Sequence, residues 1–80
     1  MGYFPFFIDI KNKNCLIVGG GKVAYRKIKK LMPYGPIIKV VAEDICGEIL
    51  SLEYDRLDIC RKSFEFSDIE GALFVITATD

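Results

Sequence analysis

The sequence predicts an α/β fold with a parallel sheet, and two observations support this. Short apolar segments rich in β-branched residues alternate with segments whose apolar residues recur at helical spacing. The first of them, CLIV (residues 15–18), is a continuous apolar run followed by glycine, which is typical of a strand covered on both faces. Strands that alternate with helices form parallel sheets with right-handed crossovers.

Size and composition indicate one small globular domain, residues 1–80. The chain is 51% hydrophobic and 28% charged, which is typical of folded rather than disordered proteins. A chain of this length buries only about 60% of its extended surface, so its stability should be marginal. No apolar run approaches the roughly 20 residues of a membrane span, and the N-terminus lacks the features of a secretory signal. We therefore expect a cytoplasmic protein.

The first half of the chain predicts a strand, a helix and a second strand. After the strand at 15–18, a helix should begin at Lys22 and end at or just before Pro33. Its apolar stripe consists of Val23, Ala24, Ile28, Leu31 and Met32. The β-branched segment IIKVV (37–41) then predicts a second strand, preceded by a Gly-Pro turn.

The second half predicts a short helix, two more strands and one helical turn. Asp44 could cap the short helix, whose apolar face would be formed by Ile45, Ile49, Leu50 and Leu52. Strands are expected at 57–61 and 72–78, separated by a turn with a capping box at residues 67–70, SDIE. The final strand has no predicted neighbour on one side, so it should pair with another chain or aggregate.

Charge and cysteine content exclude some classes of function. Net charge is zero, although residues 1–40 carry +7 and residues 41–80 carry −7. The neutral total argues against a nucleic-acid partner. The basic run at 26–30 is a solvated helix face or attracts an anionic substrate. With three cysteines, no CxxC pair and no histidine, we expect free buried thiols and no metal site.

A glycine motif points to a ligand. Residues 19–24, GGGKVA, fit the dinucleotide fingerprint G-x-G-x-x-A between a predicted strand and a predicted helix. Gly19 would allow a tight turn, Gly21 would let a pyrophosphate approach the helix N-terminus, and Ala24 would let the helix pack closely on the sheet. Lys22 would add affinity for the pyrophosphate. Alternatively, the three glycines serve only turn geometry.

An acid near the end of the second strand would complete a Rossmann-like NAD(P)-binding fold. Glu43 and Asp44 lie 19 and 20 residues after Ala24, and which of them faces the ribose stays open. Such an acid repels a 2′-phosphate, so the sequence predicts NAD rather than NADP. Thr77 and Thr79, at the end of the last strand, would contact ribose or nicotinamide, or would simply form a polar loop.

Longer motifs resemble the N-terminal domain of the siroheme synthase family, the precorrin-2 dehydrogenases that often also act as sirohydrochlorin ferrochelatases. The strings YFPFFIDIKNKNCLIVGGGKVAYRKIKKLMPYG and RKSFEFSDIEGALFVITATD carry the resemblance. It implies NAD-dependent oxidation of precorrin-2 to sirohydrochlorin in a homodimer. It also implies cofactor contacts at Lys22, Val23, Glu43 and Asp44.

The family's catalytic aspartate lies beyond a further helix and strand after A-T-D, so no catalytic residue is predicted within residues 1–80, and Asp80 does not occupy that position. Members continue into a dimerisation region and a substrate domain, so the chain should be an incomplete cofactor half with about the first four strands, inactive alone. Two alternatives remain: a non-catalytic NAD-sensing module that regulates a partner, and a chain that binds nothing.

Overall fold

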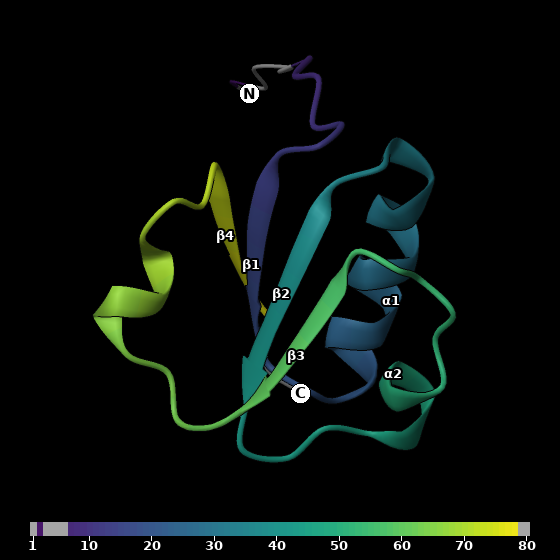
Figure 1. Ribbon diagram of the computed structural model, residues 1–80, viewed down its shortest axis with the longest axis vertical. Coiled ribbons are helices and arrows are strands. Elements are labelled where there is room, and N and C mark those ends of the chain that lie inside the picture. Colours follow the sequence, from purple (N-terminus) through teal and green to yellow (C-terminus); the bar gives the residue numbers. More distant parts are fainter. Residues whose placement is uncertain (1, 3–6, 79–80) are drawn as a thin grey trace.

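The computed structural model describes residues 2 and 7–78, and these form a four-stranded, all-parallel sheet with the order β3-β2-β1-β4. Figure 1 shows the strands side by side, with their carboxyl ends at one edge of the sheet. The predicted α/β fold is therefore confirmed. In chain order the elements are β1 (Asn14–Val18), α1 (Lys22–Leu31), η1 (Met32–Tyr34), β2 (Ile37–Ala42), α2 (Gly47–Leu50), β3 (Leu57–Arg61), η2 (Phe66–Ile69) and β4 (Phe74–Thr77).

Helix α1 lies on one face of the sheet because its apolar stripe matches that face. Ala24 and Ile28 are fully buried, together with Ile17 of β1 and Val40 of β2. Ala24, the small residue expected to face the sheet, is thus part of the core between α1 and the sheet. Helix α2 lies on the same face (Figure 1) and contributes the buried Ile49.

The opposite face is covered by the connection from β3 to β4, residues 62–73, which contains the single turn η2 (Figure 1). Leu16 of β1, only 1% exposed, lines a cavity of about 240 Å³ under this connection, together with Asp68 and Ala72. Strand β1 is thus covered on both faces, as its continuous apolar sequence predicts.

Three predicted boundaries differ from the structure. Asp44 is not a helix cap, because α2 begins only at Gly47 and its N-cap is Cys46. Ile45 and Leu52, predicted on the face of this helix, therefore lie outside it, although both pack against the core. The final strand is shorter than 72–78, since its ladder with β1 covers only Phe74–Thr77.

The capping box also differs from the predicted one. It joins Glu65 and Asp68 at the start of η2 rather than Ser67 and Glu70. The side chain of Asp68 accepts the backbone N–H of Glu65 at 2.8 Å. Glu65 and Asp68 are not the residue types that the capping-box pattern expects at these two positions, so the sequence pattern did not identify this pair. The Asp68 carboxylate also forms ion pairs with Lys39 and Lys62.

Strand β4 has no described neighbour on its outer side. Leu73 and Val75 are 49% and 36% exposed there. No helix among the described residues is both long and apolar enough to span a membrane.

Candidate functional site

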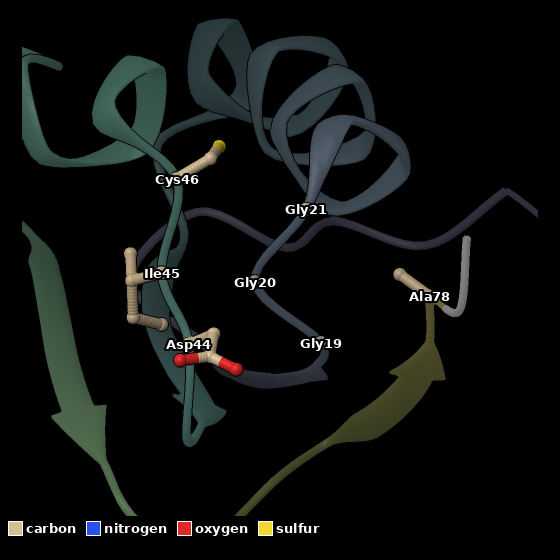
Figure 2. Close-up of a pocket in the computed structure, with 7 residues that line it drawn as sticks. All are labelled: Gly19, Gly20, Gly21, Asp44, Ile45, Cys46 and Ala78. Carbon is tan, nitrogen blue, oxygen red and sulfur yellow. The ribbon is translucent and has the colours of Figure 1, made fainter.

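A pocket of about 480 Å³ lies at the carboxyl ends of β1, β2 and β4 (Figure 2). Ligands of open parallel sheets bind at this edge, and the volume falls within the range of small-molecule sites. Three loops that are distant in sequence meet there. The lining residues are Gly19, Gly20, Gly21, Asp44, Ile45, Cys46 and Ala78.

Gly19 makes the turn out of β1. Its φ of 140° lies in a region that residues with a side chain rarely adopt. A Cβ added there would also stand 2.1 Å from the carbonyl oxygen of Ala78. Glycine is therefore required at position 19 by both the backbone conformation and the close approach of β4.

Position 20 requires glycine for a different reason. The φ of Gly20 is not positive, so the requirement comes from the neighbouring atoms. An added Cβ would stand 2.1 Å from the carbonyl oxygen of Asp44 and 2.9 Å from Cδ1 of Ile45. The carbonyl oxygen of Gly20 accepts the N–H of Cys46 at 2.7 Å. The fingerprint allows any residue at position 20, so it predicts no role for Gly20.

Gly21 is the N-cap of α1, and no side chain caps the helix there. The first turn of α1 contains no acidic residue, so the positive end of the helix dipole faces the pocket without a nearby carboxylate on that helix. Lys22 is exposed, whereas the half-buried side chain of Val23 packs against the core. These two residues therefore adjoin the pocket at the start of the helix, and their side chains do not line it.

The structure separates the two acids that follow β2. Asp44 is exposed and lines the pocket, opposite Gly19 and Gly20 in Figure 2. Glu43 instead accepts a hydrogen bond from the hydroxyl of Ser63, on the connection after β3. Of the two candidates, only Asp44 is brought together with the glycine loop.

At the end of β4, Ala78 lines the pocket and Thr77 does not. Phe74 and Ile76 pack against the core on the helix side, so the alternation along the strand places Thr77 on the opposite face. The backbone N–H of Ala78 donates to the carbonyl of Val18 at 2.9 Å, which holds β4 next to the glycine turn. Thr79 and Asp80 lie outside the described residues.

All three cysteines are free, as predicted, but only Cys15 is buried. Burial raises the pKa of the Cys15 thiol to about 11, so this thiol stays protonated at neutral pH. Cys46 lines the pocket, which the sequence gave no reason to expect. The basic residues Lys29 and Lys30 occupy the last turn of α1, at the far end from the pocket.

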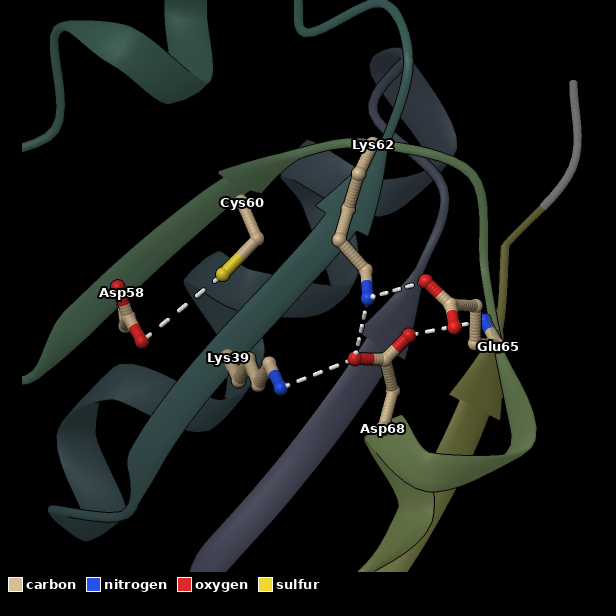
Figure 3. A network of polar contacts seen from close by, with 6 residues as sticks. All are labelled: Lys39, Asp58, Cys60, Lys62, Glu65 and Asp68. Carbon is tan, nitrogen blue, oxygen red and sulfur yellow. Dashed lines mark hydrogen bonds and ion pairs between the residues drawn. The ribbon is translucent and has the colours of Figure 1, made fainter.

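A separate polar cluster lies on the opposite face of the sheet (Figure 3). The carboxylate of Asp68, almost completely buried, pairs with Nζ of Lys62 at 3.0 Å and with Nζ of Lys39 at 3.2 Å. The backbone hydrogen bond from Glu65, followed by the bond from Lys62, lowers the pKa of Asp68 to about 2. This cluster joins η2 to β2 and lies apart from the glycine pocket.

The parallel sheet, the glycine turn at a helix N-terminus and the acidic loop after β2 together define a Rossmann-like dinucleotide-binding domain. Comparison with known proteins agrees with this class. Residues 6–80 match the family model described as "Putative NAD(P)-binding". The chain belongs to this NAD(P)-binding family.

Similar proteins also confirm the resemblance to siroheme synthase. The chain is 43% identical to a siroheme synthase of Ruthia magnifica subsp. Calyptogena magnifica and 41% identical to one of Actinobacillus pleuropneumoniae serotype 3 (strain JL03), each over its full length. It spans only 17% of the length of either protein. Among solved structures, SirC, precorrin-2 dehydrogenase, is 33% identical with a TM-score of 0.87, and the match covers 98% of this chain and 40% of that one.

Proposed function

We propose that this chain is the NAD-binding portion of a precorrin-2 dehydrogenase, which oxidises precorrin-2 to sirohydrochlorin in siroheme synthesis. One observation carries the proposal: the glycine turn, the N-terminus of α1 and Asp44 line one pocket. The names of the similar proteins supply the reaction and favour an enzyme over a sensor that only binds NAD.

The residues of the pocket suit the parts of a dinucleotide. Gly19 makes the tight turn out of β1, and Gly21 leaves room for the pyrophosphate against the backbone at the start of α1, where the helix dipole favours negative charge. Lys22 and Val23 begin that helix, so a pyrophosphate there would meet their backbone and the Lys22 ammonium group would add attraction. Asp44 would accept hydrogen bonds from the ribose hydroxyls.

The remaining candidate residues are Glu43, Thr77 and Thr79, and we propose a different role for each. Glu43 would stabilise the acidic loop through Ser63 rather than contact the ribose. Thr79 follows Ala78 of the pocket wall and stays a candidate for contact with the nicotinamide half, while Thr77 would support the end of β4. NAD, when bound, supplies the acceptor for the hydride of the substrate, and the residues named here bind and orient it.

The complete protein would hold precorrin-2 against the nicotinamide. We assign no catalytic residue within residues 1–80, because the family resemblance places the catalytic aspartate after a further helix and strand. We propose that the complete protein is a cytoplasmic homodimer, in which iron insertion could accompany the dehydrogenase reaction. The isolated chain should not convert precorrin-2 in the presence of NAD, and measurable conversion would contradict this assignment.

A calorimetric titration with NADH and with NADPH tests the cofactor assignment. We expect NADH to bind at least about tenfold more tightly, a difference of about 1.4 kcal/mol, because the Asp44 carboxylate repels a 2′-phosphate. Asp44→Ala should reduce this preference, and Glu43→Ala should leave it largely unchanged. Tighter binding of NADPH to the wild-type chain would contradict the assignment.

A further inference from the structure

Given the proposed function, we infer that Gly20 is a positioning residue for Asp44 and thereby sets the preference for NADH over NADPH. The dinucleotide fingerprint leaves position 20 unspecified. In this chain, however, Gly20 makes the direct contact between the glycine turn and the acidic loop. Figure 2 shows it between the helix start and the segment from Asp44 to Cys46.

Packing rather than conformation demands glycine at this position. The backbone of Gly20 does not adopt a positive φ, so alanine would be allowed by the chain geometry alone. The space next to its Cα is occupied by the carbonyl oxygen of Asp44, at 2.1 Å from an ideal Cβ. Because this oxygen belongs to the backbone, it cannot rotate away as a side chain could.

A hydrogen bond also joins Gly20 to the end of the acidic loop that precedes α2. The N–H of Cys46 donates to the carbonyl oxygen of Gly20 at 2.7 Å. Gly20 therefore contacts the acidic loop at both Asp44 and Cys46. The loop continues into α2, which is only four residues long.

The Asp44 carboxylate depends on this backbone contact for its position. Within the described part of the chain, the structure gives this carboxylate no hydrogen bond or ion pair with another side chain. An alanine Cβ at position 20 would stand 2.1 Å from the Asp44 carbonyl oxygen, whereas ordinary contact begins at 3.4 Å, so the two atoms would have to separate by more than 1 Å. A displacement of this size weakens a hydrogen bond to the ribose strongly.

The experiment is a double-mutant cycle with Gly20→Ala and Asp44→Ala, in which the dissociation constants of NADH and NADPH are measured by calorimetry. We expect Gly20→Ala to weaken NADH binding about tenfold with much less effect on NADPH. In the Asp44→Ala background the same change should have little further effect on the NADH preference, because no carboxylate remains to be misplaced.

Gly47→Ala is the matched control. A Cβ at Gly47 would meet no atom within 4 Å, so this variant should retain the wild-type affinities. Circular dichroism and thermal melting establish that each variant is folded at the temperature of the titration.

A second variant tests the inference if Gly20→Ala does not fold. Cys46→Pro removes the N–H that binds the Gly20 carbonyl, and the φ of −70° at Cys46 suits proline. We expect a reduced NADH preference in this variant as well.

The outcomes separate the inference from the proposed function. If the folded wild-type chain binds neither dinucleotide, the proposed function fails, and the inference fails with it. If Asp44→Ala loses the NADH preference while folded Gly20→Ala or Cys46→Pro retains it, only the inference is overturned. Additive effects of Gly20→Ala and Asp44→Ala on the preference would likewise overturn it, since they would indicate a purely structural role for Gly20.

Discussion

At the scale of single residues, three adjacent glycines have three different physical roles. Gly19 is required by its φ of 140° and by the Ala78 carbonyl, Gly20 by the Asp44 carbonyl, and Gly21 starts α1 with an ordinary φ of −96°. The motif alone predicted roles for Gly19 and Gly21. The role of Gly20 depends on a contact between loops that are distant in sequence, which no local pattern contains.

Gly19→Ala should lower the free energy of unfolding by at least about 1–3 kcal/mol, because a side chain is strained at this φ and meets the Ala78 carbonyl. Urea unfolding of the variant and of the control Gly47→Ala measures the difference. Equal midpoints for Gly19→Ala and the wild type would show that β4 does not approach Gly19 as described.

The cysteines give a second prediction at this scale. Cys15 is 1% exposed and its pKa is raised to about 11 by burial, so iodoacetamide should leave it unmodified in the folded chain at neutral pH. Cys46 lines the pocket, and saturating NAD should slow its alkylation. Cys60 lies on β3 outside the pocket and serves as the internal control.

Mass spectrometry of digested samples taken over time gives the three rates separately. Equal slowing of Cys46 and Cys60 by NAD would indicate a general stabilisation of the fold. An unchanged rate at Cys46 would count against a dinucleotide in this pocket.

At the scale of elements, hydrophobic spacing predicted the strands and α1 well and the short turns poorly. The stripe that contains Ala24 and Ile28 is a local pattern, and it extends over a whole helix. By contrast, η2 is a single turn, and its Asp68 forms ion pairs with Lys39 and Lys62, which are distant in sequence and which no local pattern contains. Aspartate is a common N-cap residue, so Asp44 was a plausible helix cap. In the structure the N–H of Cys46 donates to the Gly20 carbonyl, and α2 begins only at Gly47.

The Asp68 cluster predicts a specific dependence of stability on pH. The pKa of Asp68 is about 2 in the folded chain, below the ordinary value of 3.8. The ionised Asp68 carboxylate therefore stabilises the fold above about pH 4. This contribution should decline as the pH falls from about 4 to about 2. Asp68→Asn should be destabilised at neutral pH, and its deficit relative to the wild type should shrink across that range.

Urea unfolding of both proteins at several pH values tests this prediction, with the exposed Asp55→Asn as a control. A deficit of Asp68→Asn that stays constant between about pH 5 and about pH 2 would show that the carboxylate charge does not hold η2 to the sheet.

At the scale of the whole molecule, the order β3-β2-β1-β4 places the first strand inside the sheet and its glycine turn at the centre of the carboxyl edge. The alternation of strands and helices predicted this parallel fold, and the glycine motif lies at the edge of the sheet where the structure has the pocket. The sequence left open which acid faces the pocket, because the two are adjacent. The structure distinguishes them, since Asp44 lines the pocket and Glu43 accepts a hydrogen bond from Ser63.

The outer edge of β4 predicts self-association of the isolated chain. An unpaired strand with exposed apolar residues is a template for pairing, and Val75 is 36% exposed there. Sedimentation should show association that increases with protein concentration, and Val75→Lys should weaken it. Ser51→Lys, which adds the same single positive charge at an exposed position after α2, is the charge control. A monomer at high concentration would contradict the prediction.

The central claim, that the start of α1 receives the pyrophosphate of NAD, is tested most directly by Gly21→Asp. Gly21 is an N-cap without a side-chain hydrogen bond, and aspartate at an N-cap is preferred over glycine by a few tenths of a kcal/mol. We therefore expect a chain that melts at the wild-type temperature or slightly above it, yet no longer binds NADH in a calorimetric titration. Gly2→Asp adds the same charge at a position where an added Cβ would meet no atom within 4 Å, and this variant should bind NADH normally. Wild-type affinity for NADH in folded Gly21→Asp would contradict the account.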